Sequence, residues 1–507
     1  MESSESRSPL PEPPPDFWTP RRVRSALLLT VLLGAALRLH NLGGHVFIED
    51  EIYTLNVARG SLDSVLRSGG DPSHPPLHYL LLNLLPGAAS GEAALRLPAA
   101  AFGILSIPLL HRAGRRLLGE GPALAAALLL ALSGFHVFWS QNGRMYSTYL
   151  FFALLSMDGY LRLGSGKRAW VQYVAATVAA FYTHYFTGFL VLAQVAAFPF
   201  SPGRQGPRPW LTLLGALALV AAAAAPAVAL LVPAQLAERT REAVGLELEP
   251  LPLHVYFPWM FDQFTVANWA ASAPFQALAA IGAIRLWMRD RKTCLLLLLW
   301  LLLPLAAGWP VHYFLENIGS RMFIASMPAL YLLIAAGLVA AGRAAAGSRE
   351  GGAWSGRWAA GAVLGLLAAL SAGSVADHYA NPEEPFPWRD IASTLGSNVG
   401  PGDSLLAVPS FHEIHLNHYW PPTHSHWLNH ANTLPSIRDA VENRSRPGTL
   451  WYLQFGDVAT LPGFRGIASY IDANFLPVRI EPPLWGLFKR APLPPENATP
   501  HSPTSGF

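Results

Sequence analysis

The residues best suited to chemistry form an acidic run near the start of an otherwise apolar chain. Glu49, Asp50 and Glu51 are consecutive carboxylates, and Tyr53 follows them closely. Carboxylates beside a membrane are costly to remove from water, so such a run indicates either a solvated loop or a functional site. Asp50, with Glu51 beside it, is suited to take the proton of an attacking hydroxyl group as a general base. An acidic loop that only faces water is the alternative.

A second polar cluster follows in the sequence Asp71-Pro-Ser-His74-Pro-Pro-Leu77. The prolines stiffen the chain where a short apolar segment begins. The imidazole of His74 is suited to orient a carboxylate or to contact a phosphate, and a helix-capping role fits the spacing equally well. His184, in Tyr-Thr-His-Tyr at a turn between two apolar segments, is predicted to line the same cavity as His74.

Three arginines stand apart from the basic clusters that separate the apolar segments: Arg96, Arg144 and Arg321. An arginine fork binds phosphate oxygens in pairs, so a lipid phosphate is a common target that would explain all three. Tyr146, which follows Arg144 in Arg-Met-Tyr, is expected at the same site. The alternative is that each arginine only reaches toward the lipid headgroups.

Six histidines between His412 and His430 come closest to a metal-binding pattern. Spacing of the type His-x-x-His places two ligands on one side of a helix. No cysteine accompanies these histidines, so a polar helix face is the better interpretation and no metal site is predicted there. No cofactor is expected, although the acidic run at 49–51 has the oxygen ligands that a divalent cation prefers.

The composition predicts a polytopic membrane protein. Of the 507 residues 52% are hydrophobic and 13% are charged, about half the charged fraction of a soluble protein. The lipid bilayer is therefore an expected partner. With a net charge of only +3, no nucleic-acid partner is expected. The single cysteine, Cys294, excludes an intrachain disulfide.

The positions of Arg and Lys predict the topology, because basic residues favour the cytoplasmic side. Between Arg24 and Arg112 lie three apolar segments, of which an even number must cross. Segment 75–89 is the weakest, since it is short of the roughly 20 apolar residues that a span needs. We predict that it lies as a helix in the outer interface. Eleven crossings remain: 25–40, 96–111, 121–139, 145–161, 169–184, 186–200, 210–232, 274–288, 293–311, 321–342 and 358–376.

This topology places the N-terminus inside and the C-terminus outside. It leaves four outer polar regions: 41–95, 140–144, 233–273 and 311–320. Residues 1–20 are predicted to be a disordered cytoplasmic segment, and 21–376 the transmembrane domain. After residue 376 the apolar runs shorten to strand length, with amphipathic helical patterns between them. We therefore predict a small extracytoplasmic α/β domain over 377–491 and a disordered tail over 492–507.

Four motifs resemble those of bacterial glycosyltransferase family 39. They are Asp-Glu-Ile-Tyr from Asp50, His-Pro-Pro-Leu from His74, Leu-Arg-Leu-Pro around Arg96, and Trp-Ser-Gln-Asn-Gly-Arg-Met-Tyr, which ends at Tyr146. The resemblance is strongest over residues 1–200. This family is related to the protein O-mannosyltransferases and to the aminoarabinose transferase that modifies lipid A.

The resemblance implies a GT-C enzyme, with many spans and a site at the outer membrane face. Such an enzyme uses a polyprenyl-phosphate sugar as donor. The resemblance implies Asp50 as the catalytic residue, His-Pro-Pro on a non-spanning helix, and Arg96, Arg144 and Arg321 near the donor phosphate. The acceptor stays open between protein, lipid and glycan, because the chain lacks the trefoil-type insertion of the eukaryotic protein mannosyltransferases.

Two other classes of protein remain as alternatives. A lipid or glycolipid transporter (flippase) would also have many spans and an outer cavity, but it predicts repeated halves and ionisable residues near the bilayer midplane. A receptor-like protein would leave the polar motifs unexplained. Abundant alanine, glycine and arginine indicate a GC-rich bacterial genome, and hence the cytoplasmic (inner) membrane as location.

Overall fold

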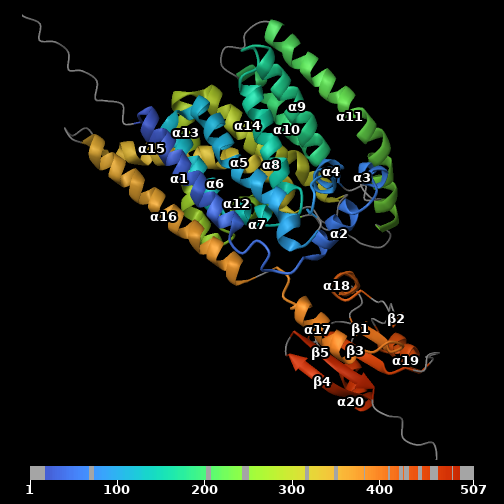
Figure 1. Cartoon of the computed structure of the whole chain (residues 1–507). Coiled ribbons are helices and arrows are strands. Elements are labelled where there is room, and N and C mark those ends of the chain that lie inside the picture. Colours follow the sequence, from blue (N-terminus) through green and yellow to red (C-terminus); the bar gives the residue numbers. More distant parts are fainter. Residues whose placement is uncertain are drawn as a thin grey trace, which may run out of the picture. The chain divides into compact units, whose positions relative to one another are not determined.

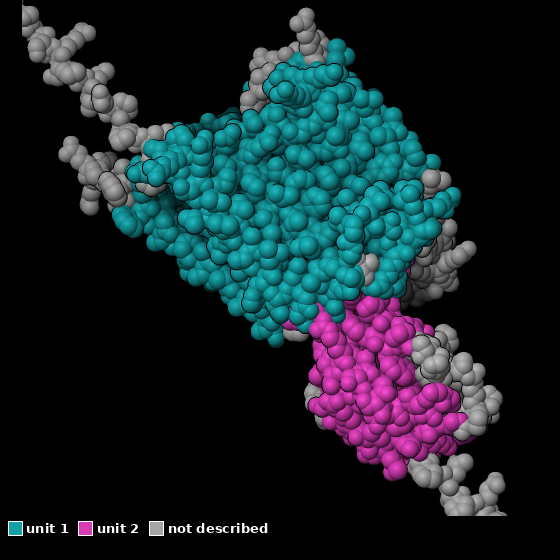
Figure 2. All heavy atoms as spheres, in the orientation of Figure 1, with its two compact units in different colours: residues 1–44, 54–381 teal, residues 45–53, 382–507 magenta. Residues whose placement is uncertain are grey.

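The chain forms two compact units in the computed structural model (Figure 2). The helical unit comprises Met1–Gly44 and Thr54–Asn381, and the sheet unit comprises His45–Tyr53 and Pro382–Phe507. The structure describes residues 18–67, 74–88, 90–200, 207–242, 251–313, 319–346, 352–381, 383–408, 412–421, 426–427, 433–442, 448–456, 466–481 and 484–490. Residues 1–17 of the predicted N-terminal segment and the whole predicted tail, 492–507, lie outside these ranges.

Helices make up nearly all of the helical unit (Figure 1). One of them, α2, begins in the sheet unit and ends in the helical unit. The α-helices are α1 (Pro20–Leu39), α2 (Glu49–Ala58), α3 (Leu62–Leu66), α4 (Leu77–Leu84), α5 (Glu92–Leu118), α6 (Glu120–Leu132), α7 (Gly134–Ser140), α8 (Tyr146–Leu161), α9 (Lys167–Thr183), α10 (Thr187–Ala197), α11 (Pro207–Glu242), α12 (Leu253–Thr265), α13 (Trp269–Arg289), α14 (Arg291–Gly308), α15 (Met327–Ala346) and α16 (Gly352–Ala380). Short 3-10 helices are η2 (Phe198–Phe200), η3 (Trp309–Tyr313) and η4 (Ser320–Ser326).

By length and composition, five of the described helices could cross a membrane, and the bent pair α6–α7 would make a sixth. The prediction of eleven crossings is finer than this test, because it includes shorter helices such as α9, with 17 residues, and α10, with 11. Helix α4 has only 8 residues, too few to cross a bilayer. This length agrees with the prediction that segment 75–89 does not span.

The outer region 233–273 contains more regular structure than the sequence analysis anticipated. Helix α12 occupies its centre and buries Tyr256, Met260 and Phe264 at every fourth position. This spacing places the three side chains along one face of the helix, against the apolar core. Tyr256 and Phe264 therefore pack inside the helical unit, whereas Trp269 at the start of α13 is 57% exposed.

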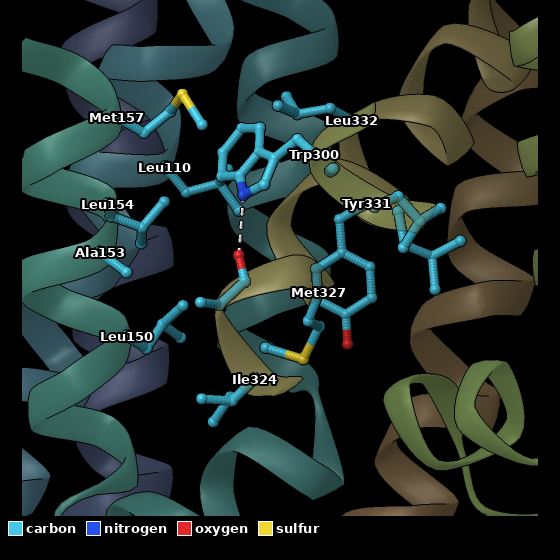
Figure 3. Packing of buried hydrophobic residues seen from close by; sticks show 14 of the residues in the cluster. Leu110, Leu150, Ala153, Leu154, Met157, Trp300, Ile324, Met327, Tyr331 and Leu332 are labelled. Carbon is cyan, nitrogen blue, oxygen red and sulfur yellow. Dashed lines mark hydrogen bonds between the residues drawn. The ribbon is translucent and has the colours of Figure 1, made fainter. Parts of the chain in front are cut away.

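The core of the helical unit contains bulky side chains from α5, α8, α14 and α15 (Figure 3). Trp300 of α14 lies near Leu110 and Leu154, and its ring N–H donates to the carbonyl of Ala325 at 2.8 Å. This hydrogen bond satisfies a carbonyl of the 3-10 helix η4 inside the core. It therefore fixes the segment that carries Arg321.

A reciprocal pair of caps joins α1 to the break between α6 and α7. The fully buried Arg38 of α1 donates to the carbonyls of Leu130 (3.0 Å) and Ala131 (2.9 Å) in the last turn of α6. In return, the side-chain amide of Gln141 donates to the carbonyls of Leu37, Arg38 and His40 at the end of α1, the last at 2.7 Å. These bonds fix the turn that follows α7.

At the opposite end of α8, the buried carboxylate of Asp158 joins two helices. It lies 3.0 Å from Arg112 and 3.2 Å from Arg116 of α5, and 2.8 Å from Arg162 at the end of α8. These arginines belong to two of the basic clusters predicted to face the cytoplasm. A single buried carboxylate therefore offsets part of their mutual repulsion.

The sheet unit has a five-stranded sheet in the order β2-β1-β3-β5-β4. The strands are β1 (Ser404–Val408), β2 (His426–Trp427), β3 (Leu450–Phe455), β4 (Phe475–Glu481) and β5 (Trp485–Arg490). β1 runs parallel to β2 and β3, whereas β5 is antiparallel to β3 and β4. Strands β1, β3 and β5 coincide with apolar runs of strand length in the sequence. The short β2 and the exposed β4 lacked a recognisable apolar pattern.

Helices cover both faces of this sheet. α17 (Trp388–Asn398) and α18 (Glu413–Tyr419) pack on the face that contains Leu405 and Leu453, and α19 (Leu434–Glu442) and α20 (Ile467–Asn474) pack on the face that contains Leu406 and Tyr452. Alternate residues of a strand point to opposite faces, which explains why the central strands are apolar at nearly every position.

The close approach of α13 and α15 gives a test of stability. A Cβ atom on Gly337 would collide with the carbonyl of Leu278, so Gly337→Ala must push the two helices apart. Over-packing of this kind usually costs about 1–3 kcal/mol. We expect a clearly lower thermal unfolding midpoint for the purified protein in detergent.

Gly361→Ala in α16 is the matched control, because nothing lies within 4 Å of a Cβ atom there. Alanine is also the better helix former, so this variant should be as stable as the wild type or slightly more stable. Equal midpoints for the two variants would contradict the tight contact between α13 and α15.

Candidate active site

The turn between α7 and α8 presents Arg144 to two other segments of the helical unit. Its backbone N–H donates to the side chain of Asn142 at 3.1 Å, which holds the turn in shape. One guanidinium nitrogen donates to the hydroxyl of Thr54 at 3.0 Å, and the other lies 3.3 Å from a ring nitrogen of His74. Arg144 is 3% exposed. Residues far apart in the sequence therefore meet at one buried guanidinium.

His78 holds the segment after His74 in place, a role that sequence reasoning missed. Its two ring nitrogens lie 3.1 Å from the hydroxyl of Thr148 and 2.9 Å from the carbonyl of Gly143. Because the imidazole is fully buried, it links α4 to the residue immediately before Arg144. In the sequence, its position four residues after His74 was the one feature that pointed to such a role.

His184 lies at the break between α9 and α10, as the sequence predicted. Its ring stacks on Tyr149, with centroids 5.1 Å apart, and lies 6.0 Å from the ring of His74. The backbone N–H of Phe186 donates to Nδ1 at 3.2 Å. The Nε2 atom is buried and has no hydrogen-bond partner among the described residues, which leaves it available to a ligand.

Arg321, in η4, lies over two aromatic rings next to this group. Its guanidinium carbon is 5.6 Å from the ring centre of Trp139 and 5.8 Å from that of Tyr146. The ring of Tyr146 is also 5.9 Å from that of His184. Arg144, His74, His184, Tyr146 and Arg321 are thus joined by a continuous series of contacts, which we call the cationic cluster.

A small, mostly apolar pocket borders the cationic cluster. Tyr149, which stacks on His184, and Met322, which follows Arg321, both line it. Its other lining residues include Phe186, Phe189, Leu190 and Phe323. An apolar pocket beside cationic groups suits a ligand that has a charged head and a hydrocarbon chain.

Two predicted site residues, Arg96 and Tyr53, are not among the five residues of the cationic cluster. Arg96 of α5 is 5% exposed and donates to the carbonyl of Leu42 at 3.1 Å, just after the end of α1. Tyr53 of α2 is 39% exposed. The contact of Arg96 ties the start of α5 to the chain that leads into the acidic run.

The acidic run forms the first turn of α2, in the sheet unit. Glu51 is buried, and its carboxylate accepts the backbone N–H of Ile48 at 3.2 Å, the contact by which a glutamate at this position closes a helix start. Burial raises the pKa of Glu49, and the neighbouring Asp50 raises it further. Asp50 is partly exposed and lies one turn before Thr54 on α2, so the two side chains share a face of this helix.

Side chains that could bind a metal ion are the histidines near α18 and the acidic run. Among the described residues, no group of three or more His, Cys, Asp or Glu side chains is arranged to hold a metal ion. Of the six histidines between 412 and 430, His415 and His418 lie on the short helix α18, whereas His426 lies on strand β2. His424 and His430 lie outside the described residues. A divalent cation at the acidic run stays a prediction.

A sequence comparison and structural comparisons agree on the class of protein. The family described as dolichyl-phosphate-mannose-protein mannosyltransferase matches residues 73–228. Among curated proteins, none matches the sequence. The structure resembles ArnT from Cupriavidus metallidurans in the apo state, with a TM-score of 0.55, 14% identity, and coverage of 92% of this chain and 98% of that one.

Two further structures show the same likeness. ArnT from C. metallidurans bound to undecaprenyl phosphate has a TM-score of 0.52 and 14% identity, over 92% of this chain and 97% of that one. The oligosaccharyltransferase from Archaeoglobus fulgidus has a TM-score of 0.58 and 13% identity, over 87% and 70%. From residue 73 to residue 228 the chain thus matches the dolichyl-phosphate-mannose-protein mannosyltransferase family, and its fold is that of the GT-C glycosyltransferases.

Proposed function

We propose that the protein is an inverting glycosyltransferase, which moves a sugar from a polyprenyl-phosphate donor to an acceptor hydroxyl at the outer face of the membrane. The observation that carries this proposal is the hydrogen bond from Arg144 to Thr54. Thr54 follows Asp50 by one turn of α2, so the proposed phosphate ligand is bonded to the helix that carries the proposed base. The family match and the structural likeness to ArnT with undecaprenyl phosphate support this donor class.

The donor phosphate would be held by the cationic cluster. A sugar linked through phosphate to a polyprenol carries one negative charge, and the polyprenyl phosphate that leaves carries a second. Arg144 and Arg321 would stabilise the charge that develops on the leaving oxygen, and Nε2 of His184 is placed to donate a hydrogen bond. Arg96 is a further candidate for the phosphate.

The reaction proceeds by a single in-line displacement. The acceptor oxygen forms a bond to the anomeric carbon while the bond from that carbon to the phosphate oxygen breaks, so the configuration inverts. The hydroxyl proton passes to the carboxylate of Asp50 as general base. Glu51 assists by closing the first turn of α2, which orients Asp50. His74, Tyr53 and Tyr146 are proposed to contact the donor or the acceptor.

The same proposal covers the membrane arrangement. Eleven crossings would place the acidic run and the sheet unit on the outer face of a bacterial cytoplasmic membrane. Mannose, glucose and aminoarabinose are all candidates for the transferred sugar, and protein, lipid and glycan are candidates for the acceptor. Turnover is therefore measured with several donors.

Replacement of the proposed base gives the first test. Asp50→Asn keeps the size of the side chain but removes its basicity, and loss of a general base usually lowers the rate by about 10²–10⁴-fold. We expect kcat for sugar release from labelled polyprenyl-phosphate sugars in nanodiscs to fall by at least about 100-fold, while donor binding persists.

Asp63→Asn is the control for this change, because Asp63 is an exposed carboxylate of α3 whose partner is the exposed Arg67. It should leave turnover unchanged. Turnover in Asp50→Asn within about twofold of the wild type would refute Asp50 as the base. If the wild type binds donor lipids but transfers none of the sugars to any acceptor, a transporter becomes the better hypothesis.

Arg144→Lys gives a second test, directed at the donor phosphate. Lysine keeps the charge but cannot donate to Thr54 and face His74 at the same time, as the guanidinium does. We expect donor binding to weaken by at least about tenfold, equivalent to about 1.4 kcal/mol. Binding of a fluorescent polyprenyl phosphate measures this directly.

Arg67→Lys makes the same chemical change at an exposed position just after α3 and should leave binding unchanged. If Arg144→Lys binds the polyprenyl phosphate as tightly as the wild type, Arg144 is not a phosphate ligand.

A further inference from the structure

The segment that precedes the acidic run is held by the sheet unit, although more than three hundred residues separate the two in the sequence. Residues His45–Tyr53 form one compact unit with Pro382–Phe507. Phe47 is 1% exposed, and its backbone N–H donates to the hydroxyl of Tyr419 in α18 at 2.7 Å. Its ring meets the edge of the His418 ring, with centroids 5.3 Å apart. Helix α18 thus holds both the backbone and the side chain of Phe47.

The helix that holds Phe47 is itself fixed firmly to the sheet unit. The ring of His415 stacks on Trp388 of α17, with centroids 4.8 Å apart and planes only 8° from parallel. Nε2 of His415 lies 3.3 Å from the carboxylate of Glu384. Burial lowers the pKa of His415 to about 4, so the ring is neutral at pH 7 and its stacking and packing fix α18.

The contacts around α18 also reach the carboxyl end of β3. His412, just before α18, contacts Phe455 there, with ring centroids 4.5 Å apart. Val46 packs against the apolar cluster that contains Phe455, Trp388 and Leu416 of α18. The residue before Phe47 is thus held by the same cluster that holds α18.

The hydrogen bonds continue from Phe47 into the acidic run. The next backbone N–H, that of Ile48, is accepted by the carboxylate of Glu51, and the carbonyl of Ile48 accepts the N–H of Glu51 at 3.0 Å. Two successive N–H groups before α2 are therefore satisfied by side chains, one from α18 and one from α2 itself. A shift of Phe47 would displace the first turn of α2, which contains Asp50.

We infer that Tyr419 is a positioning residue for Asp50, and that the sheet unit serves to hold the catalytic turn. This inference rests on the proposed function, because it takes Asp50 as the base. It gives the sheet unit a role in the chemical step, in addition to any role in acceptor binding.

The test compares Tyr419→Phe with Tyr470→Phe in full-length protein in nanodiscs. The first variant removes only the hydroxyl that accepts the Phe47 N–H. The second makes the same change on α20, away from α18 and on the other face of the sheet. For Tyr419→Phe we expect hydrogen exchange at Phe47 to accelerate by about tenfold or more and kcat to fall by about tenfold, with the donor KM unchanged. Tyr470→Phe should change none of these quantities.

Two results would overturn the inference: unchanged exchange at Phe47 in Tyr419→Phe, or faster exchange with an unchanged kcat. If Tyr419→Phe does not fold, Phe47→Leu replaces it, because leucine keeps the N–H but loses the ring contact with His418. Hydrogen exchange at Phe47 can be measured in protein that transfers no sugar. A wild type that transfers no sugar would therefore refute the proposed function, and the exchange data would still show whether Tyr419 holds Phe47.

Discussion

The arrangement of the cationic cluster depends on one constraint, the need to satisfy helix ends inside an apolar bundle. Helix α6 stops at Leu132, so the carbonyls of its last turn need donors from outside the regular helix pattern. The guanidinium of Arg38 satisfies two of them. Gln141 satisfies the end of α1 in return, and its side-chain oxygen lies 2.9 Å from His378 of α16. A buried charge is tolerated here because the carbonyls replace its hydration.

This pair of caps determines where the cationic cluster is built. Because Gln141 is fixed, the residues that follow it cannot move far, and they form the turn that presents Arg144. His78 then bonds the carbonyl of Gly143, so α4 and His74 are held to the same turn. Arg144 and His74 are thus held in place by polar side chains that bond to the backbone around them. Such support keeps a site within the small tolerances that catalysis needs.

The sequence was informative where polar residues interrupt an apolar pattern. His74, Arg144, His184 and Arg321 could be singled out because a charge or imidazole at the end of an apolar segment needs a reason, and the structure brings all four together. Arg38 and His78 could not, because each lies inside a helix and its role depends on which carbonyls the folded chain brings near. The contact between Phe47 and Tyr419 was equally invisible, since no local pattern records a pairing across most of the chain.

The separate support of the acidic run is what the proposed general base would need. Phosphate ligands can be long and flexible, because an arginine fork reaches its target from many backbone positions. A carboxylate that takes a proton from an attacking hydroxyl must lie within hydrogen-bond distance of it, so its backbone must be fixed. Asp50 has a short side chain at a helix start, where fraying is common. The Glu51 contact and the anchoring of Phe47 by α18 counter that fraying. The ten-residue helix α2 is thus held at its first turn by the sheet unit.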